Sequence, residues 1–88
     1  MAERKVKAKV VFFAKARELS GFKESEIEVE SSITYPQLLD HISKTFSLND
    51  IKGHVVLAIN LEYAENSQEP LNLKDGDEIA VIPPISGG

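Results

Sequence analysis

The chain has 88 residues, which is enough for one domain with a small core. Hydrophobic residues make up 42% of it and charged residues 27%, the balance of a folded protein rather than of a disordered one. Fourteen acidic residues against ten basic ones give a net charge of −4, which argues against a general nucleic-acid binder. The absence of cysteine excludes disulfides, thiolate metal centres and cysteine nucleophiles. We expect a cytosolic protein without a membrane partner, because the chain has neither an apolar signal-peptide core nor an apolar run of about 18 residues.

The basic residues are unevenly distributed along the chain. One interpretation is a solvated edge strand, on which lysines discourage pairing between molecules. The other interpretation is a docking patch for an acidic partner. Six of the ten basic residues lie within the first 17 positions, and these are Arg4, Lys5, Lys7, Lys9, Lys15 and Arg17.

The first predicted element is a strand over residues 6–13, where apolar and polar side chains alternate. Val11 and Phe13 break this pattern, because they share the face that the lysines occupy. Residues 14–25 are expected to form a loop. Residues 26–30 alternate again, and this second strand is predicted to form a hairpin with the first.

A helix is predicted to begin after Thr34. Thr34 and Gln37 have the spacing of a capping box, and Pro36 fits the first turn, where its missing N–H leaves no hydrogen bond unmade. One apolar stripe follows along a single face of the helix, and it consists of Leu38, Leu39, Ile42 and Phe46.

The second half of the chain is predicted to be mostly strand. Residues 49–53 are typical of a loop, and residues 55–60 form a strongly apolar third strand. Residues 61–64 could add a short strand or an edge. The last strand is predicted over residues 78–82, and Pro83-Pro84 ends it because proline cannot donate to a β-ladder.

This order of elements predicts an α+β fold of the β-grasp, or ubiquitin-like, type. One main helix would pack on one face of a mixed sheet of four to five strands. The first and last strands would lie side by side, in parallel, at the centre of the sheet. Residues 1–82 form the expected domain, and residues 83–88 form a flexible, extended tail that ends in Gly-Gly.

The chain offers few groups for chemistry of its own. His41 and His54 lack a third ligand at metal-binding spacing, so we expect no metal site and two surface or half-buried histidines. Asp75, Asp77 and Glu78 lack the spacing of a calcium loop and are typical of an acidic hairpin turn. No nucleophile elbow and no glycine-rich phosphate loop is present. We therefore expect no catalytic residue in this chain.

The C-terminal tail is the strongest candidate for a functional site. Six extended residues reach about 20 Å, and the two prolines restrict the direction of the tail at its root. Because the two glycines have no side chains, the end of the tail could pass through a narrow channel of a partner. The terminal carboxylate could then be activated as an acyl-adenylate and attacked by sulfur or by an amine. The alternative is an ordinary frayed terminus. The tail consists of Pro83, Pro84, Ile85, Ser86, Gly87 and Gly88.

The sheet face away from the helix is the second candidate site. Strand parity places a set of apolar residues on it, and an open apolar face rimmed by lysines is typical of a protein interface. The alternative is that a loop or the N-terminus covers this face. The predicted interface residues are Val11, Phe13, Val56, Ala58, Ala80 and Ile82, with Tyr63 nearby if the fourth strand forms.

Three segments of the chain resemble the small, sulfur-carrying subunit of molybdopterin synthase. Residues 12–21 read FFAKARELSG, which resembles the opening F-F-A-x-x-R-E-x-x-G of that family. Residues 75–88 read DGDEIAVIPPISGG, which resembles its ending D-G-D-E-[VI]-A-x-x-P-P-[VI]-[ST]-G-G. Residues 58–60 are similar to its A-V-N strand end. The resemblance extends over the whole chain, although residues 24–48 match only in pattern.

The resemblance implies a sulfur carrier without catalytic residues. In that family an E1-like enzyme uses ATP to adenylate the terminal glycine, here Gly88, and a sulfurtransferase converts it to a thiocarboxylate. The tail then enters the large subunit, which is expected to hold the catalytic residues, with Gly87 as the slim neighbour of Gly88. There sulfur passes to precursor Z (cyclic pyranopterin monophosphate), and two transfers build the dithiolene of molybdopterin. The resemblance also implies a heterotetramer and no permanently bound cofactor.

The resemblance also implies which residues contact partner proteins, and it leaves alternatives open for Arg17 and for the function of the chain. Phe13, Tyr63 and Ile82 match apolar contacts of that family with its partners. Arg17 matches an arginine of the family, and a structural salt bridge with Glu18 or with another nearby acid is an equally good interpretation of it. Other possible functions are a sulfur carrier for tRNA thiolation or thiamine synthesis, a ubiquitin-like protein modifier, and a β-grasp adaptor without C-terminal chemistry.

Overall fold

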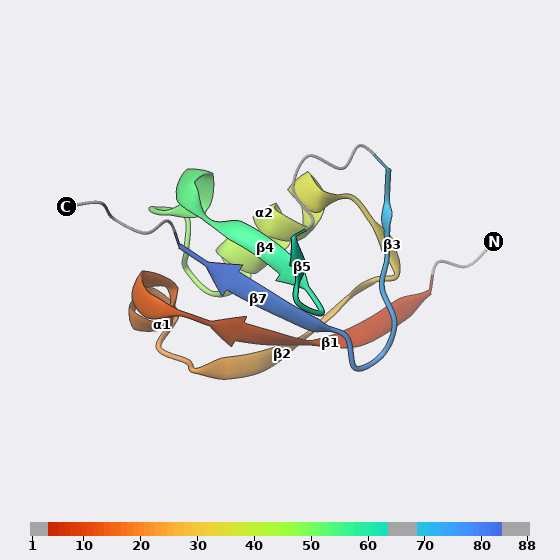
Figure 1. Cartoon of the computed structure of the whole chain (residues 1–88), viewed down its shortest axis with the longest axis horizontal. Coiled ribbons are helices and arrows are strands. Elements are labelled where there is room, and N and C mark those ends of the chain that lie inside the picture. The colour runs from red at the N-terminus through yellow and green to blue at the C-terminus, as the bar shows by residue number, and fades with distance from the viewer. Residues whose placement is uncertain (1–3, 64–68, 84–88) are drawn as a thin grey trace.

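The computed structural model describes residues 4–63 and 69–83, and it has the predicted β-grasp arrangement (Figure 1). A mixed sheet of five strands has the order β2-β1-β7-β4-β5, and helix α2 (Tyr35–Thr45) packs on one face of it. None of the described helices is long and apolar enough to cross a membrane. The strands of this sheet are β1 (Lys5–Phe12), β2 (Glu24–Glu30), β4 (Val56–Ile59), β5 (Glu62–Tyr63) and β7 (Glu78–Ile82).

Strands β1 and β7 are the centre of the sheet. They pair in parallel, with Lys9 opposite Glu78 and Phe12 opposite Val81, as the order of elements predicts. Strands β2 and β4 pair antiparallel on either side of them. The carboxyl ends of β1 and β7 therefore point to the same end of the molecule, because parallel strands run in one direction.

Helix α2 begins where the capping pattern predicts. The Gln37 N–H donates to the Thr34 hydroxyl at 3.3 Å, and the Thr34 N–H donates to the Gln37 side-chain oxygen at 3.1 Å. Two unpaired amide donors at the helix start are thereby satisfied. The apolar stripe faces the sheet: Leu38 and Ile42 have no exposed surface, and Phe46 meets the ring of Phe12 edge to face with centroids 4.8 Å apart.

The predicted loop over residues 14–25 is wrong in its first half, which forms helix α1 (Ala14–Ser20). This helix is stabilised mainly by tertiary packing, since Ala16 is fully buried and Leu19 packs against the core. Gly21 ends the helix in the left-handed conformation, and its N–H donates to the Arg17 carbonyl at 3.0 Å.

Three further short elements are absent from the sequence prediction. Strands β3 (Ser32–Ile33) and β6 (Leu71–Asn72) pair antiparallel as a separate small sheet. A single 3₁₀ turn, η1 (Lys52–His54), leads into β4. Lys52 donates to a carboxylate oxygen of Asp40 at 2.7 Å, which fastens this turn to α2.

The N-terminal lysines do not lie on an edge strand, so that interpretation is wrong. β1 lies between β2 and β7, and β2 forms the edge. Each lysine of β1 faces a glutamate of β2, which favours this strand pairing. The lysines of β1 are exposed opposite a row of glutamates, and the docking patch for an acidic partner stays a prediction. The opposed pairs are Lys5 with Glu30, Lys7 with Glu28, and Lys9 with Glu26, and the Lys9 ammonium also lies 3.4 Å from Glu24.

Candidate functional site

The sheet face away from α2 carries the apolar side chains that strand parity predicts. Their sequence neighbours Leu57, Ile79 and Val81 have no exposed surface and belong to the core. Because side chains alternate along a strand, the residues between them point to the opposite face. We call this surface the open sheet face, and it consists of Val11, Phe13, Val56, Ala58, Ala80 and Ile82.

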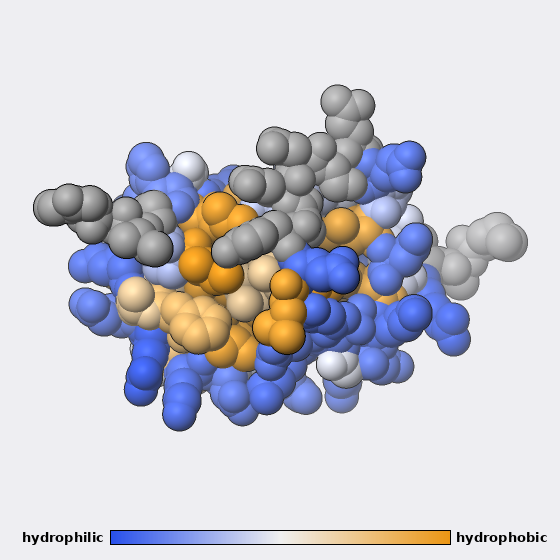
Figure 2. All heavy atoms as spheres, viewed as in Figure 1, coloured by the Kyte–Doolittle hydropathy of each residue, from blue (hydrophilic) through white to orange (hydrophobic). Residues whose placement is uncertain are grey.

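The open sheet face has a shallow floor with larger side chains around it. Ala58 and Ala80 lie directly opposite each other and are only 4% and 8% exposed. Val11 and Ile82 are half-buried, as is Val56. Figure 2 shows hydrophobic surface gathered over the carboxyl end of β7 and the start of β4. Ala80 therefore forms part of the floor of this face and offers little exposed area for contact with a partner.

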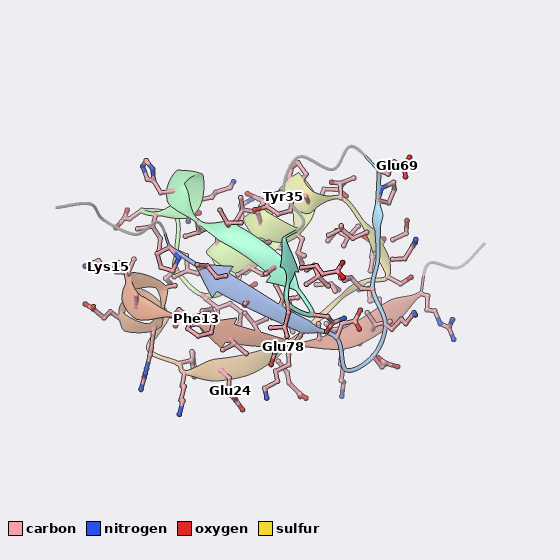
Figure 3. The ribbon with its side chains drawn as sticks, in the orientation of Figure 1. Phe13, Lys15, Glu24, Tyr35, Glu69 and Glu78 are labelled. Carbon is pink, nitrogen blue, oxygen red and sulfur yellow. The ribbon has the colours of Figure 1, made fainter. Side chains whose placement is uncertain are left out.

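Phe13 projects from the open sheet face at the start of α1. Its N–H donates to the Val81 carbonyl at 3.3 Å, which continues the parallel pairing one residue beyond β1. Ala14 then has φ +50°, a left-handed conformation that turns the chain from the strand into the helix. Phe13 is 48% exposed. Figure 3 shows it beside α1. A large ring held this openly on a rigid strand end is suited to fill a pocket of a partner.

Arg17 does not form the expected salt bridge with Glu18. Glu18 lies 4.0 Å from the Lys15 ammonium instead. Arg17 is exposed, and within residues 4–63 and 69–83 it has no ion pair. Its matching position in the motif therefore has no structural explanation.

The predicted tail begins at the end of β7 that lies beside Phe13. Pro83 follows this strand and is half-buried. The tail residues Pro84, Ile85, Ser86, Gly87 and Gly88 lie outside the described residues, so the roles assigned to them from the sequence stay predictions. The same holds for the side chain of Tyr63, although its backbone pairs with Ala58 at the border of the open sheet face.

The acidic residues before β7 hold a turn together. Asp75 accepts the Lys7 N–H at 2.9 Å, and Asp77 accepts the Lys74 N–H at 2.8 Å. The Asn60 side chain donates to Asp77 at 3.0 Å, and this bond, followed by the one from Lys74, lowers the pKa of the Asp77 carboxyl. These carboxylates are hydrogen-bond acceptors of the turn. In the part of the chain that the structure describes, no three His, Asp or Glu side chains gather as metal ligands would.

Asn60, the last residue of the segment 58–60 that resembles the family's A-V-N strand end, has a structural role in the turn after β4. It has φ +50°, and its side-chain oxygen accepts the Glu78 N–H at 2.9 Å. Asparagine tolerates the left-handed conformation better than most residues, so its place after an apolar strand is a signal for a turn. Its bonds connect the end of β4 with the start of β7.

The family comparison matches most of the chain. A model of the ThiS family covers residues 10–88. A relative from Drosophila melanogaster named molybdopterin synthase sulfur carrier subunit is 45% identical over 83 residues, which are 94% of this chain and 92% of the relative. A human relative of the same name is 41% identical over 80 residues, which cover 90% and 91% of the two chains.

Solved structures support the same family. A candidate molybdopterin converting factor, subunit 1, from Pyrococcus furiosus has a TM-score of 0.70 and 33% identity over 91% of this chain and 99% of its own. A complex of subunits 1 and 2 of molybdopterin-converting factor from Helicobacter pylori contains a chain that matches with a TM-score of 0.66 and 25% identity. The match covers 94% of the present chain and 100% of the Helicobacter chain. The small archaeal modifier protein 1 of Methanosarcina acetivorans shares the fold, with a TM-score of 0.73 and 23% identity. The match covers 97% of this chain and 99% of the archaeal one. With the family model matching nearly its whole length, the chain belongs to the ThiS family.

Proposed function

We propose that this chain is the sulfur carrier subunit of molybdopterin synthase and that Gly88 carries the sulfur as a thiocarboxylate. The observation that carries the proposal is the 45% identity, over 94% of the chain, to a relative with that name. The open sheet face and the strand end beside it supply a docking surface next to the root of the tail. The globular part delivers the tail, and the chemistry takes place on the partners.

The proposed charging reaction needs no acid or base from this chain. A carboxylate oxygen of Gly88 attacks the α-phosphate of ATP on an E1-like activating enzyme, and pyrophosphate leaves. A hydrosulfide ion from the sulfur donor then attacks the glycyl carbonyl, AMP leaves as the bond between the acyl carbon and the phosphate oxygen breaks, and a glycyl thiocarboxylate remains. In the large subunit the thiocarboxylate sulfur forms a C–S bond to precursor Z as an oxygen substituent leaves that carbon. Water then hydrolyses the bond between the acyl carbon and sulfur, so the sulfur stays on the pterin precursor and the carboxylate of Gly88 is restored. Two such transfers supply the two sulfur atoms of the dithiolene.

The proposed partner for transfer is the large subunit of molybdopterin synthase. A relative is known in a complex of subunits 1 and 2 of molybdopterin-converting factor, which supports a pairing of this kind. We assign Phe13, Ile82, Val11 and Val56 to the contact with the large subunit, because they are the larger apolar side chains of the open sheet face. A heterotetramer with two copies of each subunit completes the proposal.

A test of the function is the mass of the intact chain after charging. The chain, ending at Gly88, is incubated with the activating enzyme, ATP and a sulfur donor. We expect a mass gain equal to the exchange of one oxygen for one sulfur, and molybdopterin formation when the large subunit and precursor Z are added. The control is the chain without Gly88, which should fold equally well and gain no sulfur.

Two outcomes contradict this function. One is a chain that keeps its native mass while a carrier for tRNA thiolation is charged under the same conditions. The other is the recovery of Gly88 in isopeptide linkage to lysines, which would indicate a protein modifier like the archaeal proteins that share the fold.

A further inference from the structure

The turn between β4 and β5 holds a leucine in an unfavourable conformation. Asn60 and Leu61 have φ values of +50° and +74°, and consecutive positive φ values are typical of a type I′ turn. Asparagine and glycine are the residues that such turns favour, because a Cβ crowds the following carbonyl in the left-handed region. Leu61 therefore has a backbone conformation that is unfavourable for a residue with a Cβ atom.

Neighbouring hydrogen bonds keep the turn in this conformation. The Asn60 N–H donates to the Glu78 carbonyl at 2.8 Å, and the Asn60 side chain bonds both the Glu78 N–H and the Asp77 carboxylate. The turn is thus fastened to the start of β7 on one side and continues into β5 on the other. Strain that the surrounding structure enforces in this way is a feature of functional sites.

Solvent exposure is a second unfavourable property of Leu61. Its side chain is 87% exposed, against 48% for Phe13 and 49% for Phe22, the other exposed large hydrophobic residues that the structure describes. Phe22 packs edge to face on Phe46 and so contributes to the fold. Among the described residues, Leu61 belongs neither to the hydrophobic core nor to the side chains packed against it.

The position of Leu61 continues the open sheet face. The turn directly follows Ala58 and Ile59, and Ala58 of the open sheet face pairs through its backbone with Tyr63 of β5. In Figure 2, hydrophobic surface extends from the main patch toward the region where Figure 1 draws the β4–β5 turn. Three acidic residues lie at this turn, Glu62 exposed, and Asp77 and Glu78 half-buried. Lys9 lies opposite Glu78 and Lys74 lies beside Asp77, so within the described chain Glu62 is the acid without a neighbouring base on an adjacent strand.

We propose that Leu61 is an anchor for the large subunit and that it inserts into an apolar pocket bordered by basic side chains. This inference rests on the proposed function, and it extends the contact beyond the open sheet face to the β4–β5 turn. The partner pocket would bury the exposed side chain, and basic groups around it would complement the acids beside the turn. The fixed turn presents the leucine without a loss of backbone freedom on binding.

The test compares stability and binding in one variant. Leu61→Asn places a residue suited to the turn at this position, so the melting temperature should rise by about 4–8 °C. The dissociation constant for the large subunit from the same organism should rise about tenfold, because an anchor side chain is lost. The matched control is Phe22→Asn, which removes an apolar side chain of similar size from the α2 side of the sheet. It should lower the melting temperature and leave the dissociation constant unchanged.

The outcomes separate this inference from the proposed function. If the unchanged chain binds the large subunit and Leu61→Asn binds equally well, the anchor role is wrong and the function stands. If Leu61→Asn melts at a lower temperature, the leucine stabilises the fold and the anchor role is likewise wrong. If the unchanged chain does not bind the large subunit at all, the proposed function fails, and the anchor role fails with it.

Discussion

Ser43 in helix α2 is a buried hydroxyl within an apolar layer. It has no exposed surface, and its Oγ has no hydrogen-bond partner among the residues that the structure describes. A buried polar group without a partner loses its bonds to water and gains nothing in exchange. Alanine at this position removes that loss and has a higher helix propensity.

We expect Ser43→Ala to raise the free energy of unfolding by about 1 kcal/mol. Chemical denaturation measures this as a higher midpoint with an unchanged slope. Sulfur transfer should not change, because Ser43 lies on the helix side of the sheet. A lower midpoint would indicate that the hydroxyl is bonded to a buried water and contributes to the native state.

The Asn60–Asp77 bond links two elements that are distant in sequence, β4 and β7. The bond from Asn60, followed by the one from Lys74, lowers the pKa of Asp77, so the folded state favours the ionised carboxylate. The stability contribution is therefore present above the ordinary value of 3.8 and is lost as the pH falls through the lowered pKa of the folded state.

We expect Asp77→Asn to flatten the dependence of stability on pH below about pH 4, because the titrating group is removed. Denaturant unfolding at a series of acidic pH values measures this. Asp50→Asn, at an exposed position, is the control and should leave the pH dependence nearly as it is. Equal pH profiles for Asp77→Asn and the unchanged chain would show that Asp77 does not couple protonation to folding.

The elements differ in how far the sequence predicts them. Helix α2 is predictable, because its capping box and apolar stripe are local patterns. Helix α1 has only two inward-facing side chains, Ala16 and Leu19, so its short pattern is too weak to separate from a loop. Strands β3 and β6 have two residues each and form only by pairing with each other. They are about 40 residues apart in the sequence, so no local pattern predicts them.

The candidate site also has a part that the sequence predicts, the open sheet face, and a part that it does not, the β4–β5 turn. Alternation with a period of two predicts the open sheet face, because β4, β7 and the end of β1 keep apolar side chains on the face opposite the buried one. The bond between Asn60 and Asp77 joins the residue after β4 to the residue before β7, and the same turn holds Leu61 at a φ of +74°. Sequence spacing contains no record of either, so only the folded chain reveals the turn as part of the face.

At the scale of the whole molecule, docking and stability are separable properties. The core packs between α2 and one side of the sheet, whereas Phe13 projects from the other side with 48% of its surface exposed. A charge at this position would remain in water in the free chain and would be buried unpaired in a complex.

We expect Phe13→Asp to weaken binding of the large subunit by about 2–4 kcal/mol and to lower the free energy of unfolding by about 1 kcal/mol or less. Calorimetric titration measures the first quantity and thermal unfolding the second. Phe13→Leu, which stays apolar, should retain most of the affinity. A collapse of thermal stability in Phe13→Asp would instead assign this side chain to the core.

The parallel pairing of β1 with β7 also governs when the protein can acquire its shape during synthesis. Lys9 lies opposite Glu78, so the two central strands are about 70 residues apart, and contacts of such separation form slowly. While the ribosome translates the intervening segment, β1 and β2 can form only a hairpin, which is marginally stable in water. The apolar side chains of β1 therefore stay incompletely covered until the last strand is available, and such exposed surface favours aggregation of a nascent chain.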